Sequence, residues 1–211
     1  MNYAAVDAGG NAVVKVEVPA EWANIVVKEE EHTADAARPD FVKKIVDPIN
    51  ALKGDLLPVS AFNGREDGTW DNGTAAYEKR GIAVDVPEWK IGNCIQCNQC
   101  AYVCPHAVIR PFLATEEEAA ASGVEWKQGL GETKEYKFRI QISPMDCTGC
   151  SNCVDVCPAK DKALVMRPLE EQMPQQKNWD YITKNIGYKQ VVDKTKSVKN
   201  LQFAQPLFEF S

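Results

Sequence analysis

The eight cysteines of this 211-residue chain fall in two short blocks with one repeated spacing. Each block places cysteines at positions i, i+3, i+6 and i+10, and a proline follows the last one. The blocks hold Cys94, Cys97, Cys100 and Cys104, and Cys147, Cys150, Cys153 and Cys157. Such clustering indicates metal ligation, because a disulfide framework does not need a repeated spacing and is disfavoured in a reducing compartment.

The spacing is typical of proteins that bind two [4Fe-4S] clusters. Each cube has four iron corners, and cysteines at i, i+3 and i+6 let one tight loop reach three of them. In the bacterial two-cluster pattern the fourth ligand is the Cys-Pro cysteine of the other motif. The first [4Fe-4S] cluster is therefore expected on Cys94, Cys97, Cys100 and Cys157. The second is expected on Cys147, Cys150, Cys153 and Cys104.

Zinc is the main inorganic alternative, but structural zinc sites usually combine two pairs of ligands separated by a longer loop. A cube bound by four thiolates has no open coordination position for a substrate, so the expected chemistry is one-electron transfer. The sequence has no Ser-His-Asp arrangement, phosphate loop, His-Glu-x-x-His motif or thiamine-diphosphate signature. No catalytic residue is predicted.

Short strands are expected to position the two blocks. An apolar stretch follows each Cys-Pro, at residues 107–109 and 163–165, and these stretches are predicted to be paired strands. Neither loop-plus-strand unit can bury its apolar face alone. The predicted fold is therefore α+β, a bacterial-ferredoxin-like domain with pseudo-twofold symmetry and a core between the clusters.

The insertion between the blocks has its own signals. Thr115 and Glu118 form a capping-box pattern, residues 116–121 favour a helix, and Gly123 ends it. Apolar and polar residues then alternate over 136–143, which predicts a strand with one apolar and one solvated face that leads to Cys147.

The flanks contain no cysteine. Upstream, we expect a helix over 39–52 interrupted near Pro48, a loop over 63–74, and a strand in which Ile82, Val84 and Val86 alternate. Downstream, residues 169–211 are predicted to be an irregular arm with a short helix around 179–186. The predicted domains are 1–88, a small mixed linker domain, 89–168, the two-cluster domain, and 169–211, a connector.

The composition is that of a soluble globular protein, with 45% hydrophobic and 26% charged residues. The net charge of −6 argues against a nucleic-acid surface. No apolar run approaches the roughly 20 residues of a membrane span, and the N-terminus does not resemble a secretory signal. We therefore expect a cytoplasmic protein that binds neither membrane nor nucleic acid.

Other residues near the blocks have two interpretations each. His106 could tune a cluster, but a packed or exposed histidine is the favoured interpretation. Trp89 and Tyr102 could lie between a cluster and a partner, and packing that shields a cube from water is favoured. Three cations could attract an acidic partner protein, and solvated surface charge is favoured for them: Lys160, Lys162 and Arg110.

Several runs resemble the pyruvate:ferredoxin (or flavodoxin) oxidoreductases, and the resemblance covers nearly the whole chain. The runs are 77–83 (Tyr-Glu-Lys-Arg-Gly-Ile-Ala), 86–89 (Val-Pro-Glu-Trp), 104–110 (Cys-Pro-His-Ala-Val-Ile-Arg), the second cysteine block and 205–211. The resemblance implies that 1–88 is the linker domain carrying Glu-Lys-Arg, and that 169–211 leads towards a thiamine-binding domain that this sequence does not contain.

By the same resemblance, the chain relays electrons from the oxidative decarboxylation of pyruvate to ferredoxin or flavodoxin. Its main partner would be the remainder of the parent enzyme, which would hold thiamine diphosphate, Mg and a third [4Fe-4S] cluster. The segment alone is not expected to turn over pyruvate. Two alternatives stay open, a free-standing ferredoxin-type carrier and a separate subunit of a related 2-oxoacid oxidoreductase.

Overall fold

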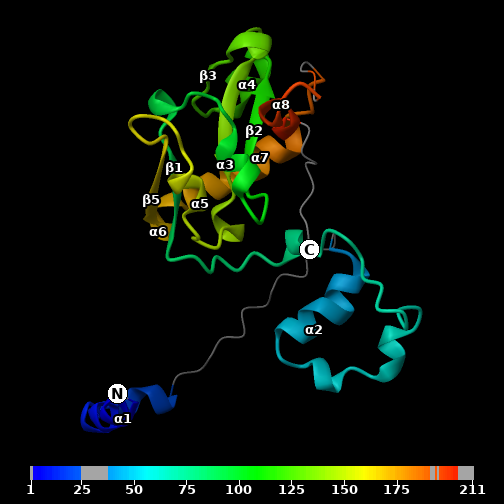
Figure 1. Cartoon of the computed structure of the whole chain (residues 1–211). Helices are drawn as coiled ribbons and strands as arrows, with labels where there is room; N and C mark the ends of the chain where they lie inside the picture. The colour runs from blue at the N-terminus through cyan, green and yellow to red at the C-terminus, as the bar shows by residue number, and fades with distance from the viewer. Residues whose placement is uncertain (1, 25–37, 191–192, 194, 204–211) are drawn as a thin grey trace. The chain divides into compact units, whose positions relative to one another are not determined.

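The computed structural model describes residues 2–24, 38–190, 193 and 195–203 (Figure 1). The chain divides into two compact units, residues 1–38 and 39–211. The first unit contains helix α1 (Asn2–Asn11) and a 3₁₀-helix (Ala20–Asn24), neither of which has a buried residue. The 205–211 run, one of those that carry the family resemblance, lies outside the described residues.

The second unit begins with a helical segment that changes type. A π-helical stretch (Val42–Val46) runs directly into α2 (Asp47–Asn50), which contains Pro48. Proline lacks an N–H and clashes with the carbonyl four residues before it in an α-helix, so a wider turn precedes it here. The interruption predicted near Pro48 is confirmed, as a change of helix type. Three 3₁₀-helices follow, Gly54–Leu56, Val59–Phe62 and Thr74–Tyr77, with the predicted 63–74 loop before the last.

Two small antiparallel sheets form the centre of this unit. In one, β1 (Asp85–Trp89) pairs with β5 (Leu164–Pro168). In the other, β4 (Lys137–Ile142) lies between β2 (Ile109–Ala114) and β3 (Lys127–Gln128).

The prediction that the strands after the two Cys-Pro pairs bond to each other was wrong. β2 leaves the first cysteine block and pairs with β4, which enters the second block. β5 leaves the second block and pairs with β1, which enters the first. Each strand that leaves a block therefore forms its hydrogen bonds with the strand that leads into the opposite block, and the two outgoing strands do not meet.

The first strand begins later than its alternating pattern suggested. Ile82 and Val84 are 69% and 85% exposed, whereas Ala83 and Val86 are buried. Ladder pairing starts only at Asp85, opposite Pro168, so the described part of the chain leaves Ile82 and Val84 largely uncovered.

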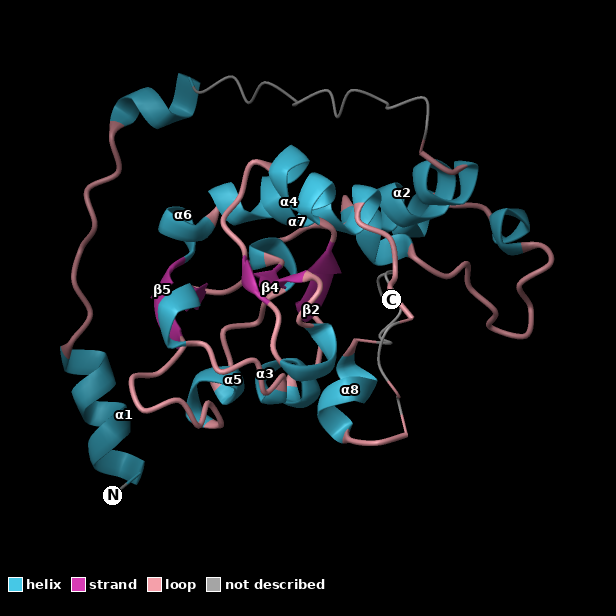
Figure 2. Ribbon diagram, turned by 90° about the horizontal axis from the view of Figure 1, so that it is seen from above, coloured by secondary structure: helices cyan, strands magenta, loops and turns pink. Residues whose placement is uncertain are grey.

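β4 confirms the predicted strand but corrects its solvated face. Arg139 and Gln141 are buried, because helix α7 (Pro174–Asn185) packs against this strand. Arg139 donates to Gln175 Oε1 at 3.2 Å and to the Glu125 carbonyl at 2.5 Å. Figure 2 shows the strands between two helical layers, with α4 and α7 on one side and α3, α5 and α8 on the other.

The insertion helix matches its signals. α4 (Glu116–Ser122) has both hydrogen bonds of the capping box between Thr115 and Glu118, and Gly123 ends it in the left-handed conformation. A 3₁₀-helix (Gly131–Thr133) and the strand β3 complete the insertion.

The described part of the C-terminal segment is more regular than the predicted irregular arm, and α7 confirms the short helix predicted around 179–186. It contains α6 (Leu169–Gln172), α7 and α8 (Val198–Gln202). Helix α7 and the turn after it bury three apolar side chains, Trp179, Ile182 and Ile186. These pack against Phe112, Ala114 and Ala119. This stripe holds α7 in place. No helix among residues 2–24, 38–190, 193 and 195–203 is long and apolar enough to cross a membrane.

Candidate iron-sulfur centres

The loops of the two cysteine blocks share two left-handed backbone positions. The third position of each block has a positive φ, 59° at Gln96 and 72° at Gly149. The fifth position does so as well, 60° at Asn98 and 64° at Ser151. A short helix follows each loop, α3 (Gln99–Val103) in the first and α5 (Asn152–Asp155) in the second. Left-handed residues in such a loop can turn nearby N–H groups towards one side, as in anion-binding nests.

The first block encloses one cavity together with a cysteine of the second. A space of about 340 Å³, which includes its opening to solvent, is lined by four cysteines and by apolar groups that include Leu164 and Ala163. The four cysteines are Cys94, Cys97, Cys100 and Cys157. The structure therefore brings together the four residues that the spacing assigned to the first cluster.

A second cavity has the reciprocal composition. A space of about 330 Å³, again including its opening, is lined by apolar groups that include Ile109 and Met166, and by four cysteines. These are Cys104, Cys147, Cys150 and Cys153. A 3₁₀-helix precedes the first cysteine in both blocks, Ile91–Asn93 and Pro144–Asp146.

The thiols differ in exposure. Cys147 and Cys153 are buried, Cys150 is exposed, and the others are half-buried. Burial raises the pKa of Cys153 to about 12, and the nearby Cys147, Cys104 and Cys150 add to this. Burial also raises the pKa of Cys100 and of Cys147. Buried thiols of this kind remain protonated without a cation beside them, so the positive charge of iron would be needed to convert them to thiolates.

The donor set fits an iron-sulfur cube. Each cavity offers four sulfur atoms and few competing ligands, and backbone N–H groups approach sulfur. The Gly149 N–H donates to Cys147 Sγ at 3.4 Å, and the Ala163 N–H donates to Cys157 Sγ at 3.3 Å. In the part of the chain that the structure describes, no three Cys, His, Asp or Glu side chains lie close enough together to hold a single metal ion.

The insertion and the C-terminal helix hold the first loop. Gln96 donates to the Gln128 carbonyl at 2.7 Å and accepts from the Leu130 N–H at 3.1 Å. Asn98 donates to the Lys199 carbonyl of α8 at 3.1 Å. Sequence reasoning missed Gln96 and Asn98, which lie between the ligands and are 1% and 2% exposed. Two amides within a metal loop were the available signal, but nothing in the sequence indicated their partners.

The structure supports the favoured interpretation for some of the residues near the blocks and not for others. His106 and Lys160 are exposed, as favoured. Tyr102 is 62% exposed, so its assignment as a packing residue was wrong. Trp89 is half-buried and packs edge-on against Phe138, with ring centroids 6.3 Å apart.

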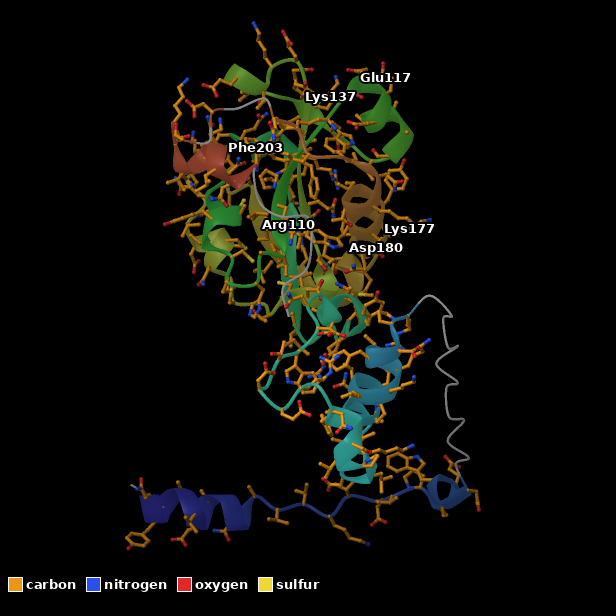
Figure 3. The ribbon with its side chains drawn as sticks, turned by 90° about the vertical axis from the view of Figure 1, so that its right-hand side faces the viewer. Arg110, Glu117, Lys137, Lys177, Asp180 and Phe203 are labelled. Carbon is orange, nitrogen blue, oxygen red and sulfur yellow. The ribbon has the colours of Figure 1, made fainter. Side chains whose placement is uncertain are left out.

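Arg110 corrects another prediction. It is only 3% exposed and is not solvated surface charge. Its Nε donates to the Ala107 carbonyl at 3.0 Å, and its guanidinium lies 5.3 Å from the centre of the Trp179 ring. Figure 3 shows Arg110 on the side of the strands that faces α7, which bears Lys177 and Asp180.

Known proteins are similar to this chain over its entire length. Residues 93–160 match a family of 4Fe-4S dicluster domains, and residues 27–83 match a family described as a domain of unknown function, EKR. Pyruvate:ferredoxin oxidoreductase of Moorella thermoacetica is 49% identical and pyruvate-flavodoxin oxidoreductase of Enterobacter agglomerans 47% identical, each over 100% of this chain. The mitochondrial NADP⁺ pyruvate dehydrogenase of Euglena gracilis is 43% identical over 100% of it.

The chain spans 18% of the length of the first two relatives and 12% of the third. The dicluster match, with all eight cysteines present, shows that the chain binds two [4Fe-4S] clusters. The chain thus belongs to the pyruvate:ferredoxin (flavodoxin) oxidoreductase family, as a segment that contains the iron-sulfur dicluster domain.

Proposed function

We propose that this chain is an intramolecular one-electron relay whose two clusters are bound by crossed ligands. The first cluster takes Cys94, Cys97, Cys100 and Cys157, and the second takes Cys147, Cys150, Cys153 and Cys104. One observation carries the assignment: each cavity is lined by three cysteines of one block and the Cys-Pro cysteine of the other.

The strand pairing supports the crossing. Cys104 and Cys157 lie at the ends of their blocks, shortly before β2 and β5, and each of these strands pairs with the strand entering the opposite block. The chain after each block is therefore already directed to the other half. Together with the shared loop conformation, this exchange favours a pseudo-twofold ferredoxin-like domain. We place that domain at 89–168, with a linker domain at 1–88 and a connector at 169–211.

The protein's own role is to hold the cubes in fixed, partly dry positions. Leu164 and Ile140 border the first cavity, and Ile109 and Val108 border the second. Apolar surroundings disfavour the extra negative charge of a reduced cube, whereas N–H groups near sulfur favour it. Fully thiolate-ligated cubes leave no position for a substrate, so each accepts one electron and passes it on.

The names of the relatives support a wider role. In the parent enzyme, oxidation of pyruvate with coenzyme A would yield acetyl-CoA, CO₂, one proton and two electrons. Thiamine diphosphate with Mg, held elsewhere in that enzyme, would supply the carbon chemistry. Electrons would pass singly through a third [4Fe-4S] cluster and then through this chain to ferredoxin or flavodoxin, in the cytoplasm.

Metal analysis and EPR test the relay. Anaerobically purified chain should contain about eight iron and eight sulfide, and both cubes should undergo reversible one-electron reduction. Added to the remainder of the parent enzyme, the chain should restore pyruvate-dependent ferredoxin reduction. Iron-free protein would refute cluster binding. Intact clusters with no affinity for that remainder and no restored activity would instead favour a free-standing carrier.

A further inference from the structure

Two lysine side chains lie on the backbone of the proposed ligands of the first cluster. Lys127 Nζ donates to the Cys94 carbonyl at 2.7 Å and to the Ile91 carbonyl at 2.9 Å. Lys162 Nζ donates to the Cys157 carbonyl at 2.9 Å. Cys94 and Cys157 come from different blocks and line the same cavity, so the two ammonium groups bind the backbone of two ligands proposed for one cluster.

Both charges are held in place by several acceptors. Lys162 also donates to the carbonyls of Val154 and Asp155, at 2.9 Å each, and so caps the end of α5. Lys127 is half-buried and begins β3, whose pairing with β4 sets its position. Among the described residues, neither lysine takes part in an ion pair with a carboxylate, so no paired carboxylate offsets either charge.

The second site has a different electrostatic setting. The residue before its first cysteine is Asp146, whose carboxylate pairs with Lys79 at 2.6 Å. The buried cation Arg110 donates to the Ala107 carbonyl, which does not belong to a proposed ligand. The first block contains no charged residue, whereas the second contains Asp155. Asp155 and Asp161 are exposed and oppose Lys162 in part, but solvent screens exposed carboxylates.

We propose that Lys127 and Lys162 raise the reduction potential of the first cluster relative to the second. The proposal rests on the ligand assignment above. Reduction converts [4Fe-4S]²⁺ to [4Fe-4S]⁺ by one added electron. A fixed cation nearby stabilises the added negative charge, more strongly where the surroundings are partly buried. The two cubes, although bound by identical cysteine spacing, would thus differ in the ease with which they accept an electron.

EPR-monitored redox titration of the cluster-loaded chain measures the effect. Lys127→Met and Lys162→Met remove the charge and keep the length of the side chain. We expect Lys127→Met to lower the equilibrium constant for reduction of one cluster about tenfold, about 59 mV for one electron. Lys162→Met should lower it roughly threefold, because the exposed ammonium is screened more. Both variants should shift the signal that Cys157→Ser perturbs.

Matched variants separate charge from structure. Lys134→Met and Lys160→Met remove exposed lysines from the same two segments and should shift neither potential. Lys127→Arg keeps the charge and should keep the potential. If Lys127→Met lowers the iron content, Lys162→Met, at an exposed position, decides the question. Intact clusters with unshifted or equally shifted potentials overturn the lysine proposal alone, whereas an unmodified chain without clusters overturns the relay as well.

Discussion

Gln96 and Gly149 occupy the same position in the two cysteine blocks and share a left-handed backbone, with φ of 59° and 72°. They achieve it differently. The buried amide of Gln96 bonds to the backbone of Gln128 and Leu130. At Gly149 no side chain fits, because a Cβ would lie 2.9 Å from the Asp85 carbonyl oxygen. The same left-handed conformation is therefore stabilised by side-chain hydrogen bonds in the first loop. In the second loop it is permitted by the absence of a side chain.

Gly149→Ala should loosen the second loop. A non-glycine residue in the left-handed region costs about 1–2 kcal/mol, and the clash with Asp85 adds to this. We expect lower iron content and loss of the EPR signal of the second cluster, with the first retained. Gly92→Ala is the control, because nothing lies within 4 Å of a Cβ there. Equal iron content in both variants would contradict the prediction.

Gln96→Ala should destabilise the first loop and its contact with the insertion. It removes both amide bonds and leaves the Gln128 carbonyl without its side-chain donor, at a cost of about 1–3 kcal/mol. The expected result is a lower melting temperature and faster hydrogen exchange in the insertion. The exposed Gln99 supplies the control, and Gln99→Ala should behave as the unmodified chain. A comparable loss in both variants would show that the contact is unimportant.

Exchange of the crossing ligands should have reciprocal effects. Cys157→Ser should alter the cluster of the first block, and Cys104→Ser that of the second, because each lines the opposite cavity. Site-resolved EPR or Mössbauer spectra distinguish the two cubes. If each substitution altered the cluster of its own block, ligation would be local and the assignment would be wrong.

The cap of α4 should weaken at low pH. Burial raises the pKa of Glu118, but hydrogen bonds from Lys189 and the Thr115 N–H outweigh it, so the pKa is lowered overall. A carboxyl with a lowered folded-state pKa stabilises the fold above its unfolded pKa, about 4.3, and this contribution is lost as pH falls further. Glu118→Gln should thus reduce the melting temperature at pH 7 more than at pH 4. An equal reduction at both pH values would argue against a charge effect.

The cap itself provides a separate test. Thr115→Ala should cost about 1 kcal/mol, because the Thr115 hydroxyl accepts from the Glu118 N–H at 3.2 Å. Denaturant unfolding measures the loss, and Thr115→Ser, which keeps the hydroxyl, should recover most of it. A full loss in the serine variant would point to the methyl group instead.

Local signals in the sequence were sufficient for several features. The spacing of the cysteines predicted two cubes, since the ligands of a cubane follow from the reach of one tight loop and a returning residue. The helix at 116–122 was also predictable, because the capping box and Gly123 act within a few residues. Pro48 marked a change in its helix for the same reason. These features depend on neighbours in the chain, which a single sequence displays.

Other features depend on residues far apart in the chain, and only the tertiary structure decided them. Arg139 and Gln141 alternate as a solvated face would, yet α7 buries them. The side chains of Gln96 and Lys127 form hydrogen bonds with backbone carbonyls more than 30 residues away. The sequence alone was enough to predict two iron-sulfur clusters and to propose the cysteines that bind them. Long-range packing decided which strands pair and which backbone groups the lysine side chains contact, because such contacts form only after the distant segments meet.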